Sequence, residues 1–170
     1  MKNLLNISDL ERHKIIQSFD SISKKPEFMV IDVGAGAETS SMSFMASANK
    51  VVIVITGEPT SFTDSYALIK AAYLDYKMDN FGIIVNMNHK LQAKLYFEKF
   101  QSVVQRFIGV TPNYLGHVPP SRKIKNSIIA RSPIMSNNKN SDEAKAFNNI
   151  STSLLTLNSN KTDGIKFFNI

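Results

Sequence analysis

Short, nearly continuous runs of apolar residues are the feature that most constrains how this chain folds. Three of them cover residues 28–33, 51–56 and 81–86, and residues 114–118 form a weaker fourth. Runs of this length without polar alternation are typical of strands that are buried on both faces of a parallel sheet. We therefore predict one strand over each of the four ranges.

The segments between these runs have the spacing of amphipathic helices. Apolar side chains recur every three or four positions over residues 60–77 and 91–108. A Ser-Asp-Leu-Glu sequence at residues 8–11 has the spacing of a capping box and predicts a helix to about residue 22, and Ser or Asp near 141 starts a last helix that ends near 157. Alternating helices and strands predict an α/β fold, a parallel sheet with helices on both faces.

The amino-acid composition and the short length of the apolar runs exclude several classes of protein. The 170 residues include no cysteine, which excludes a disulfide scaffold, a thiol nucleophile and a cysteine-ligated metal. The longest apolar run, residues 51–55, is far short of the roughly 20 residues that cross a bilayer, and the N-terminus has no apolar core of the length of a secretory signal. We expect a cytoplasmic protein with one domain over 1–157, a polar linker and a short basic amphipathic tail over 158–170.

The positive charge is concentrated in the last third of the chain. Residues 121–170 hold eight Lys/Arg and three Asp/Glu, which accounts for most of the net charge of +6. Such a segment is compatible with anionic lipid, nucleic acid or an acidic partner. A solvated face is the simpler interpretation, and no aromatic residue is interleaved with the cations to stack on single-stranded bases. The densest cluster is Arg122, Lys123, Lys125 and Arg131.

The first predicted strand is followed by a sequence that suits phosphate and magnesium. It ends in Asp32-Val-Gly34-Ala-Gly36. A carboxylate at that place can hold a metal through water, and glycines let backbone N–H groups approach phosphate oxygens. A tight turn in which Asp32 caps a helix explains the same residues, and both interpretations stay open.

Other kinds of site have less support. A dinucleotide fingerprint after the first strand, with Glu58 binding the ribose, is disfavoured because Thr39 replaces the third glycine and Asp32 would lie beside the pyrophosphate. The amide of Asn86, which ends the third strand, can recognise an adenine edge, although Asn is also common in turns. The three histidines have no metal-ligand spacing. The sequence contains no Gly-x-x-x-x-Gly-Lys-Ser/Thr phosphate-binding loop and no Gly-x-Ser-x-Gly elbow.

Taken together, the motifs at the strand ends resemble those of one family. They are Phe28-Met-Val-Ile-Asp-Val-Gly-Ala-Gly36, Glu58-Pro-Thr-Ser61, Thr63-Asp-Ser-Tyr-Ala-Leu-Ile-Lys70, Ile84-Val-Asn-Met87 and Tyr114-Leu-Gly-His-Val-Pro119. In this order they resemble the MinD/ParA ATPases, P-loop NTPases of the SIMIBI class, and within them the flagellar site-determining FlhG/FleN/YlxH branch. The resemblance runs from about residue 10 to 133 and corresponds to the C-terminal three-fifths of a typical member.

The resemblance implies a site for ATP and Mg²⁺. Asp32 is the implied catalytic residue, which organises Mg²⁺ through a water together with the attacking water, and the backbone of Gly34 faces the γ-phosphate. Val33 stands where Thr is usual in this branch. The other implied nucleotide-binding residues are Gly36, the adenine-recognising Asn86, and Pro119 and Pro120, which flank the base.

The absent phosphate-binding loop changes what the resemblance implies about activity. Without its lysines and Ser/Thr, most of the stabilisation of phosphoryl transfer is lost, so we expect little or no hydrolysis by this chain alone. In the family's sheet the strand before that loop lies between the strands that end at Asp32 and Thr56. A folded chain must pair these two strands directly, fill the gap in another way, or receive a strand from another chain.

The resemblance also implies a process and partners. Intact relatives work in flagellar placement or number control, dimerise around ATP, associate peripherally with the inner face of the cell membrane and contact flagellar assembly proteins, including an SRP-type GTPase. Lys166, Phe167 and Phe168 of the tail are the candidate membrane contacts, and packing of the aromatic side chains back onto the domain is the alternative. Two other functions stay open, a non-catalytic adaptor that binds no nucleotide and a ParA-like module that binds DNA non-specifically.

Overall fold

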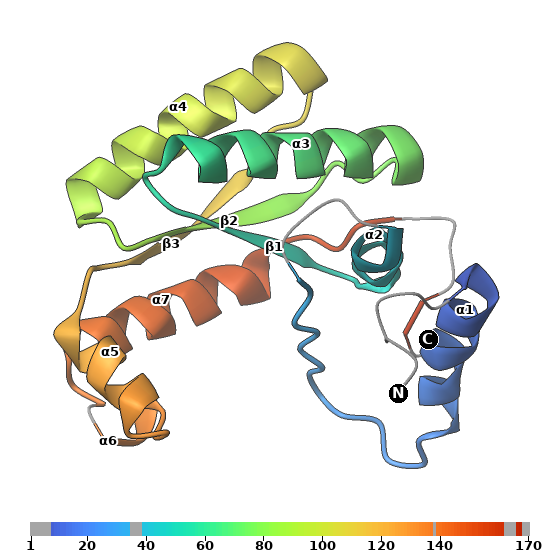
Figure 1. Cartoon of the computed structure of the whole chain (residues 1–170), viewed down its shortest axis with the longest axis horizontal. Coiled ribbons are helices and arrows are strands. Elements are labelled where there is room, and N and C mark those ends of the chain that lie inside the picture. The colour runs from blue at the N-terminus through green and yellow to red at the C-terminus, as the bar shows by residue number, and fades with distance from the viewer. Residues whose placement is uncertain (1–7, 35–38, 138, 162–165, 168–170) are drawn as a thin grey trace.

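The computed structural model describes residues 8–34, 39–137, 139–161 and 166–167. In this part of the chain a parallel three-stranded sheet, in the order β1-β2-β3, has helices on both faces (Figure 1). The α/β fold that the sequence predicts is therefore confirmed. The strands are β1 (Val51–Ile55), β2 (Phe81–Asn86) and β3 (Asn113–Val118).

From α2 to α5 single helices alternate with the three strands, as the sequence predicts. The predicted helices correspond to α1 with its 3₁₀ extension, α3, α4 and α7. The bounds are α1 (Asp9–Ser18), η2 (Phe19–Ser21), α2 (Thr39–Ser47), α3 (Pro59–Tyr76), α4 (Lys90–Ile108), α5 (Arg122–Ile129), α6 (Ile134–Asn137) and α7 (Asp142–Thr156).

Serine caps fix the starts of α1, α5 and α7. The Ser8 hydroxyl accepts a hydrogen bond from the backbone N–H of Glu11 (3.3 Å), and the backbone N–H of Ser8 donates to Glu11 Oε2 (2.8 Å). This is the predicted capping box, and its hydrogen bonds from Ser8 hold the pKa of Glu11 below its usual value. Ser141 starts α7 in the same way, because its hydroxyl accepts from the N–H of Ala144 (3.1 Å).

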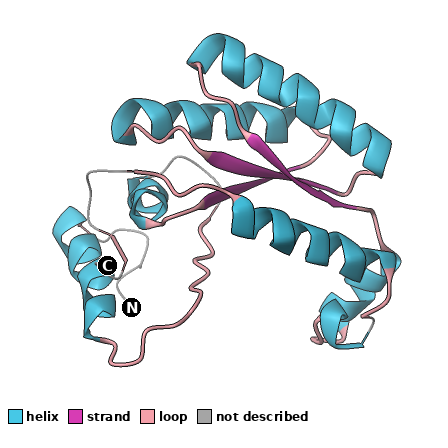
Figure 2. Ribbon diagram, turned by 180° about the vertical axis from the view of Figure 1, so that it is seen from behind, coloured by secondary structure: helices cyan, strands magenta, loops and turns pink. Residues whose placement is uncertain are grey.

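Each face of the sheet has its own apolar core, because successive residues of a strand point to opposite sides. Helices α3 and α4 cover one face, where Ile53, Ile55 and Val85 are buried against residues such as Phe100. Helix α7 covers the other face, and Figure 2 shows it there from behind. The core on that side consists of Leu115, Val118, Ile150 and Leu157, with Val52, Ile84, Ile124 and Leu154 packed against it.

The predicted strand over residues 28–33 does not form. These residues have no regular secondary structure, and the side chains of Phe28 and Val30 are 67% and 93% exposed. A strand is stable only when its N–H and C=O groups pair with a neighbour, and β1, at the edge of the sheet, pairs with β2 alone in the described part of the chain. Direct pairing between residues 28–33 and β1 is thus not what the structure shows.

The chain after α7 returns along the amino ends of the strands. Asn160 donates its backbone N–H to the carbonyl oxygen of Asn49 (2.8 Å), just before β1, and Phe167 donates to that of Ser47 (3.3 Å), at the end of α2. Residues 158–161 thus lie against the domain. The division at residue 157 that the sequence predicts stays a prediction.

Among the described residues, no helix combines the length and the apolar character that crossing a membrane requires.

Candidate functional site

The candidate site is the turn at the carboxyl ends of β2 and β3. Asn86 ends β2 and lies in register with Val118, which ends β3. The N–H of Asn88 donates to the carbonyl oxygen of Val118 (3.3 Å), and Asn88 Nδ2 donates to that of Asn86 (2.9 Å). These bonds tie the two strand ends together through one asparagine that the sequence does not single out.

Asn86 is held in one orientation within this turn. Its Oδ1 accepts the backbone N–H of Met87 (2.9 Å), and Met87 has a left-handed φ of 56°. The side chain is half-buried, so it is supported by protein and still reaches solvent. An amide oxygen has a second lone pair and the NH₂ group has two donors, so the group retains the capacity for the paired bonds that an adenine edge offers.

Pro119 and Pro120 follow Val118 directly, which places them beside the Asn86 turn. Pro119 is half-buried and Pro120 is exposed. The structure therefore brings together the three residues that the sequence predicts for the adenine side, as expected for strands that end at one edge of a parallel sheet. Their role in binding stays a prediction.

Basic side chains gather at the same edge. Burial, Lys90 and His89 together lower the pKa of His117, in that order of importance. His117 lies on β3 opposite Val85, and His89 and Lys90 form the start of α4. The spacing of His89 and His117 in the sequence does not show that they meet, because the convergence of two strand ends is not visible from it.

The loop after β1 reaches this turn from the other side. A side chain at Gly57 would have its Cβ 3.2 Å from Asn88 Oδ1, so this glycine lies against the asparagine. Ser61 accepts the N–H of Thr56 (2.9 Å), and Tyr96 donates its hydroxyl to the carbonyl oxygen of Glu58 (3.1 Å). The loop that carries Glu58-Pro-Thr-Ser61 is thereby fixed next to the carboxyl end of β2.

The magnesium side of the predicted site is placed differently from expectation. Asp32 is exposed and belongs to no strand, so the prediction that it closes a buried strand is wrong. Gly34 has no atom within 4 Å of an added Cβ, and its carbonyl oxygen accepts from the Ser41 hydroxyl at 3.5 Å. Gly36 lies outside the described residues. The adenine side of the predicted site is therefore surrounded by residues of this chain, whereas Asp32 and Gly34 on the magnesium side are exposed.

Known proteins are similar in sequence to this chain over part of their length. The chain is 34% identical over 128 residues to the antiactivator FleN of Pseudomonas aeruginosa, covering 75% of this chain and 46% of FleN. It is 29% identical over 107 residues to the flagellum site-determining protein YlxH of Helicobacter pylori, covering 62% of this chain and 36% of YlxH. The chain is homologous to FleN and YlxH. The resemblance drawn from the sequence motifs is therefore confirmed.

The match to these homologues is partial. The chain spans less than half the length of either FleN or YlxH. No family model matches the chain. The functions of the complete FleN and YlxH proteins are therefore proposals for this chain.

The residues present fit an adenine better than a metal. Within the described ranges no three His, Asp or Glu side chains gather into a metal-binding group. Asp32 supplies one exposed carboxylate, and a magnesium ion in a nucleotide site is normally held by further protein and phosphate oxygens. We therefore assign no magnesium-dependent step to the residues of this chain alone.

The candidate membrane residues of the tail pack on the domain where they are described. Lys166 Nζ donates to the carbonyl oxygen of Ala46 (3.0 Å), and burial lowers the pKa of this lysine. The Phe167 ring is buried, edge-on to Phe19 at 5.3 Å between centroids and stacked on Phe44 at 6.1 Å. Phe168 lies outside the described residues, and membrane contact by this tail stays a prediction.

Proposed function

We propose that this chain works in the control of flagellar placement or number. The observation that carries the proposal is its homology to YlxH, a flagellum site-determining protein, and to the antiactivator FleN. Deleting the coding sequence in the source organism and counting flagella per cell by electron microscopy tests it. A changed number or position of flagella is the expected result, and wild-type flagellation in the deletion strain contradicts the proposal.

We further propose that the Asn86 turn binds the adenine of ATP. The support is geometric, since Asn86, Pro119 and Pro120 are neighbours at one edge of the sheet and the Asn86 amide is held by Met87. Lys90, at the start of α4 beside the same edge, favours an anionic ligand. The sequence contains no phosphate-binding loop, so the phosphates and Mg²⁺ require groups beyond the ones shown here, with Asp32 and the backbone of Gly34 and Gly36 as contributors.

Titration with a fluorescent ATP analogue in the presence of Mg²⁺ tests the adenine site. We expect saturable binding that Asn86→Ala weakens at least about fivefold, because paired bonds to a base contribute about 1–3 kcal/mol. The matched control is Asn148→Ala, an exposed asparagine on α7 whose carbonyl oxygen, not its amide, accepts a hydrogen bond from Thr152. Asp32→Ala is expected to change binding little while the phosphate-binding groups are absent.

The same titration has outcomes that contradict the proposal. Absence of binding up to millimolar nucleotide leaves an interaction domain without nucleotide as the better account. Equal losses in Asn86→Ala and Asn148→Ala place any binding elsewhere. Homodimerisation around ATP, contact with an SRP-type GTPase and other flagellar assembly proteins, and binding to the membrane surface are proposals that rest on the same family relationship.

A further inference from the structure

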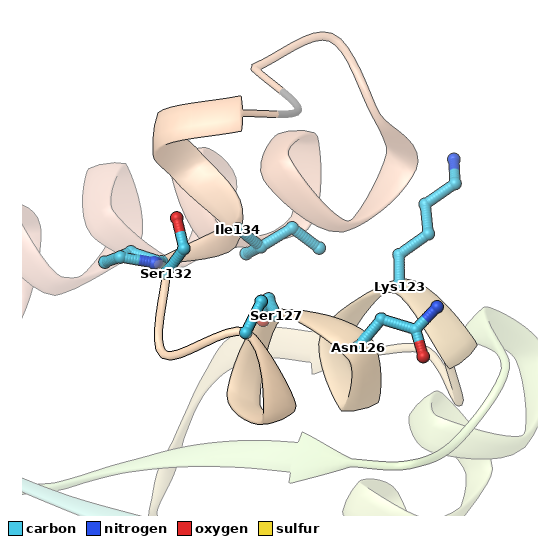
Figure 3. Close-up of a pocket in the computed structure, with 7 residues that line it drawn as sticks. Lys123, Asn126, Ser127, Ser132 and Ile134 are labelled. Carbon is cyan, nitrogen blue, oxygen red and sulfur yellow. The ribbon is translucent and has the colours of Figure 1, made fainter.

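A small pocket lies between α5 and α6, in the first part of the basic stretch over residues 121–170. It has a volume of about 240 Å³, and Figure 3 shows Lys123 and Asn126 at one end of it, with Ile134 and Ser132 toward the other. Ala130, Pro133 and Ile134 give the lining an apolar part, and the ammonium and amide groups add hydrogen-bond donors. Pockets for drug-sized molecules measure roughly 300–1,000 Å³, so this one suits one or two side chains of a docked segment.

The surface around the pocket is positively charged. Residues 121–141 contain five Lys/Arg and no Asp/Glu, and these five side chains are exposed. The two nearest acids in the sequence are already engaged: Glu143 is buried and accepts from the Ser121 hydroxyl, and Asp142 pairs with Lys145 at 3.3 Å. A ligand that approaches this surface therefore meets a field that favours negative charge.

Exposed apolar side chains lie next to the cations. Helix α5 has no buried residue, and Ile128 and Ile129 are 71% and 73% exposed. Ile129 lies one helical turn after Asn126 of the pocket lining, and together with the apolar part of the pocket it offers area that a partner can cover. The surface that we call the α5–α6 surface consists of Lys123, Asn126, Ile129, Arg131 and Ile134.

We propose that the α5–α6 surface binds an acidic, aliphatic segment of a partner protein. Carboxylates of that segment pair with Lys123 and Arg131, the Asn126 amide donates to a carboxylate or backbone carbonyl, and one aliphatic side chain enters the pocket against Ile134. A concave pocket for single side chains favours a protein segment over the broad, flat surface of a membrane. Nucleic acid is disfavoured because it would leave Ile129 uncovered and find no aromatic side chain among residues 121–137 to stack on.

Isoleucine methyl NMR of the whole chain tests the proposal directly. The probe is a synthetic twelve-residue peptide of repeated Glu-Leu-Glu-Ser, with a matched peptide in which Gln replaces Glu. We expect the acidic peptide to shift the methyl signals of Ile129 and Ile134, to leave those of the buried Ile53 and Ile69 unchanged, and to lose affinity as salt rises. The Gln peptide is expected to bind at least tenfold more weakly.

Two charge-reversal variants locate the binding. Lys123→Glu is expected to weaken the acidic peptide at least tenfold, and Lys99→Glu, which makes the same change on an exposed position of α4, is expected to change it less than twofold. Circular dichroism melting confirms that both variants fold. No shift up to millimolar acidic peptide, equal losses in both variants, or binding of phosphatidylglycerol vesicles or duplex DNA at this surface without peptide binding overturns the proposal.

Discussion

Asn160 and Asn80 are joined by two hydrogen bonds across 80 residues of sequence. Asn160 Nδ2 donates to the carbonyl oxygen of Asn80 (2.8 Å), and the N–H of Asn80 donates to Asn160 Oδ1 (3.0 Å). Asn160 is 5% exposed, and Asn80 Oδ1 accepts from Asn113 Nδ2 (2.8 Å) at the start of β3. These amides connect the segment after α7 to the amino ends of β2 and β3.

Replacing the Asn160 side chain is expected to destabilise the domain. Asn160→Ala leaves the N–H and carbonyl of Asn80 without these partners, and an unsatisfied buried polar group costs about 1–3 kcal/mol. Urea unfolding at equilibrium measures the change. Asn158→Ala is the control, because Asn158 contributes its carbonyl oxygen to Asn80 and keeps it in the variant. Equal stability of the two variants contradicts this account of the Asn80–Asn160 contact.

Gly116 is expected to tolerate no side chain. It has φ of 146°, lies where β3 gains one residue relative to β2, and an added Cβ would approach Ile150 Cγ1 to 2.7 Å. Gly116→Ala should lower the free energy of unfolding by about 2 kcal/mol from backbone strain and overpacking against α7. Thermal melting compares it with Gly34→Ala, where the new methyl group meets no atom within 4 Å. A Gly116→Ala variant as stable as the Gly34→Ala variant disproves the expectation.

Lys50 caps the end of α7. Its ammonium group donates to the carbonyl oxygens of Leu154 and Leu155, both at 2.9 Å, where the helix leaves carbonyls without partners and carries partial negative charge. Lys50→Met keeps the aliphatic stem and should cost about 1–2 kcal/mol of stability, measured by urea unfolding. The same change at Lys70, exposed on α3, should cost less than about 0.5 kcal/mol. A Lys50→Met variant with wild-type stability shows that water replaces this cap fully.

The carboxyl group of Glu143 makes the free energy of unfolding depend on pH. The hydrogen bond from Ser121, and then that from its own backbone N–H, hold the pKa of Glu143 below its usual 4.5. The folded state therefore gains stability from the carboxylate above pH 4.5 and loses it as the pH falls through the lowered folded-state pKa. Wild type should exceed Glu143→Gln in stability near neutral pH, and urea titrations toward about pH 3 should show the difference shrink. A difference that is constant with pH rules out Glu143 as its source.

The parts of the fold that sequence predicts are those whose cause is local or repeated. Residues 51–55 and 81–86 are apolar on both faces because both faces are covered, and Ser8 and Ser141 carry their caps within three residues. The run over residues 28–33 is apolar in the same way, but in the described part of the structure no neighbouring strand pairs with it. Pairing is a property of two segments, so the apolar pattern of one segment overpredicts a strand there.

The candidate site likewise contains some features that the sequence predicts and others that it does not. Asn86 and Pro119 meet because parallel strands end at one edge, which the order of the motifs is sufficient to predict. Asp32 was expected at that kind of edge only because its strand was expected. Nothing in the sequence predicts the contact between Asn160 and Asn80. Asn160 lies in a polar stretch that has the composition of a linker, and its partner is not visible from the sequence.

The packing of Phe167 on Phe19 has a consequence for how this protein forms during synthesis. The two rings lie far apart in the sequence, so the segment of α1 and η2 that carries Phe19 gains this contact only after Phe167 has left the ribosome. The sheet and α3 with α4 are built from residues between them and can assemble earlier. Translation that stops short of Phe167 should therefore yield a folded centre with a first helix that protease removes readily.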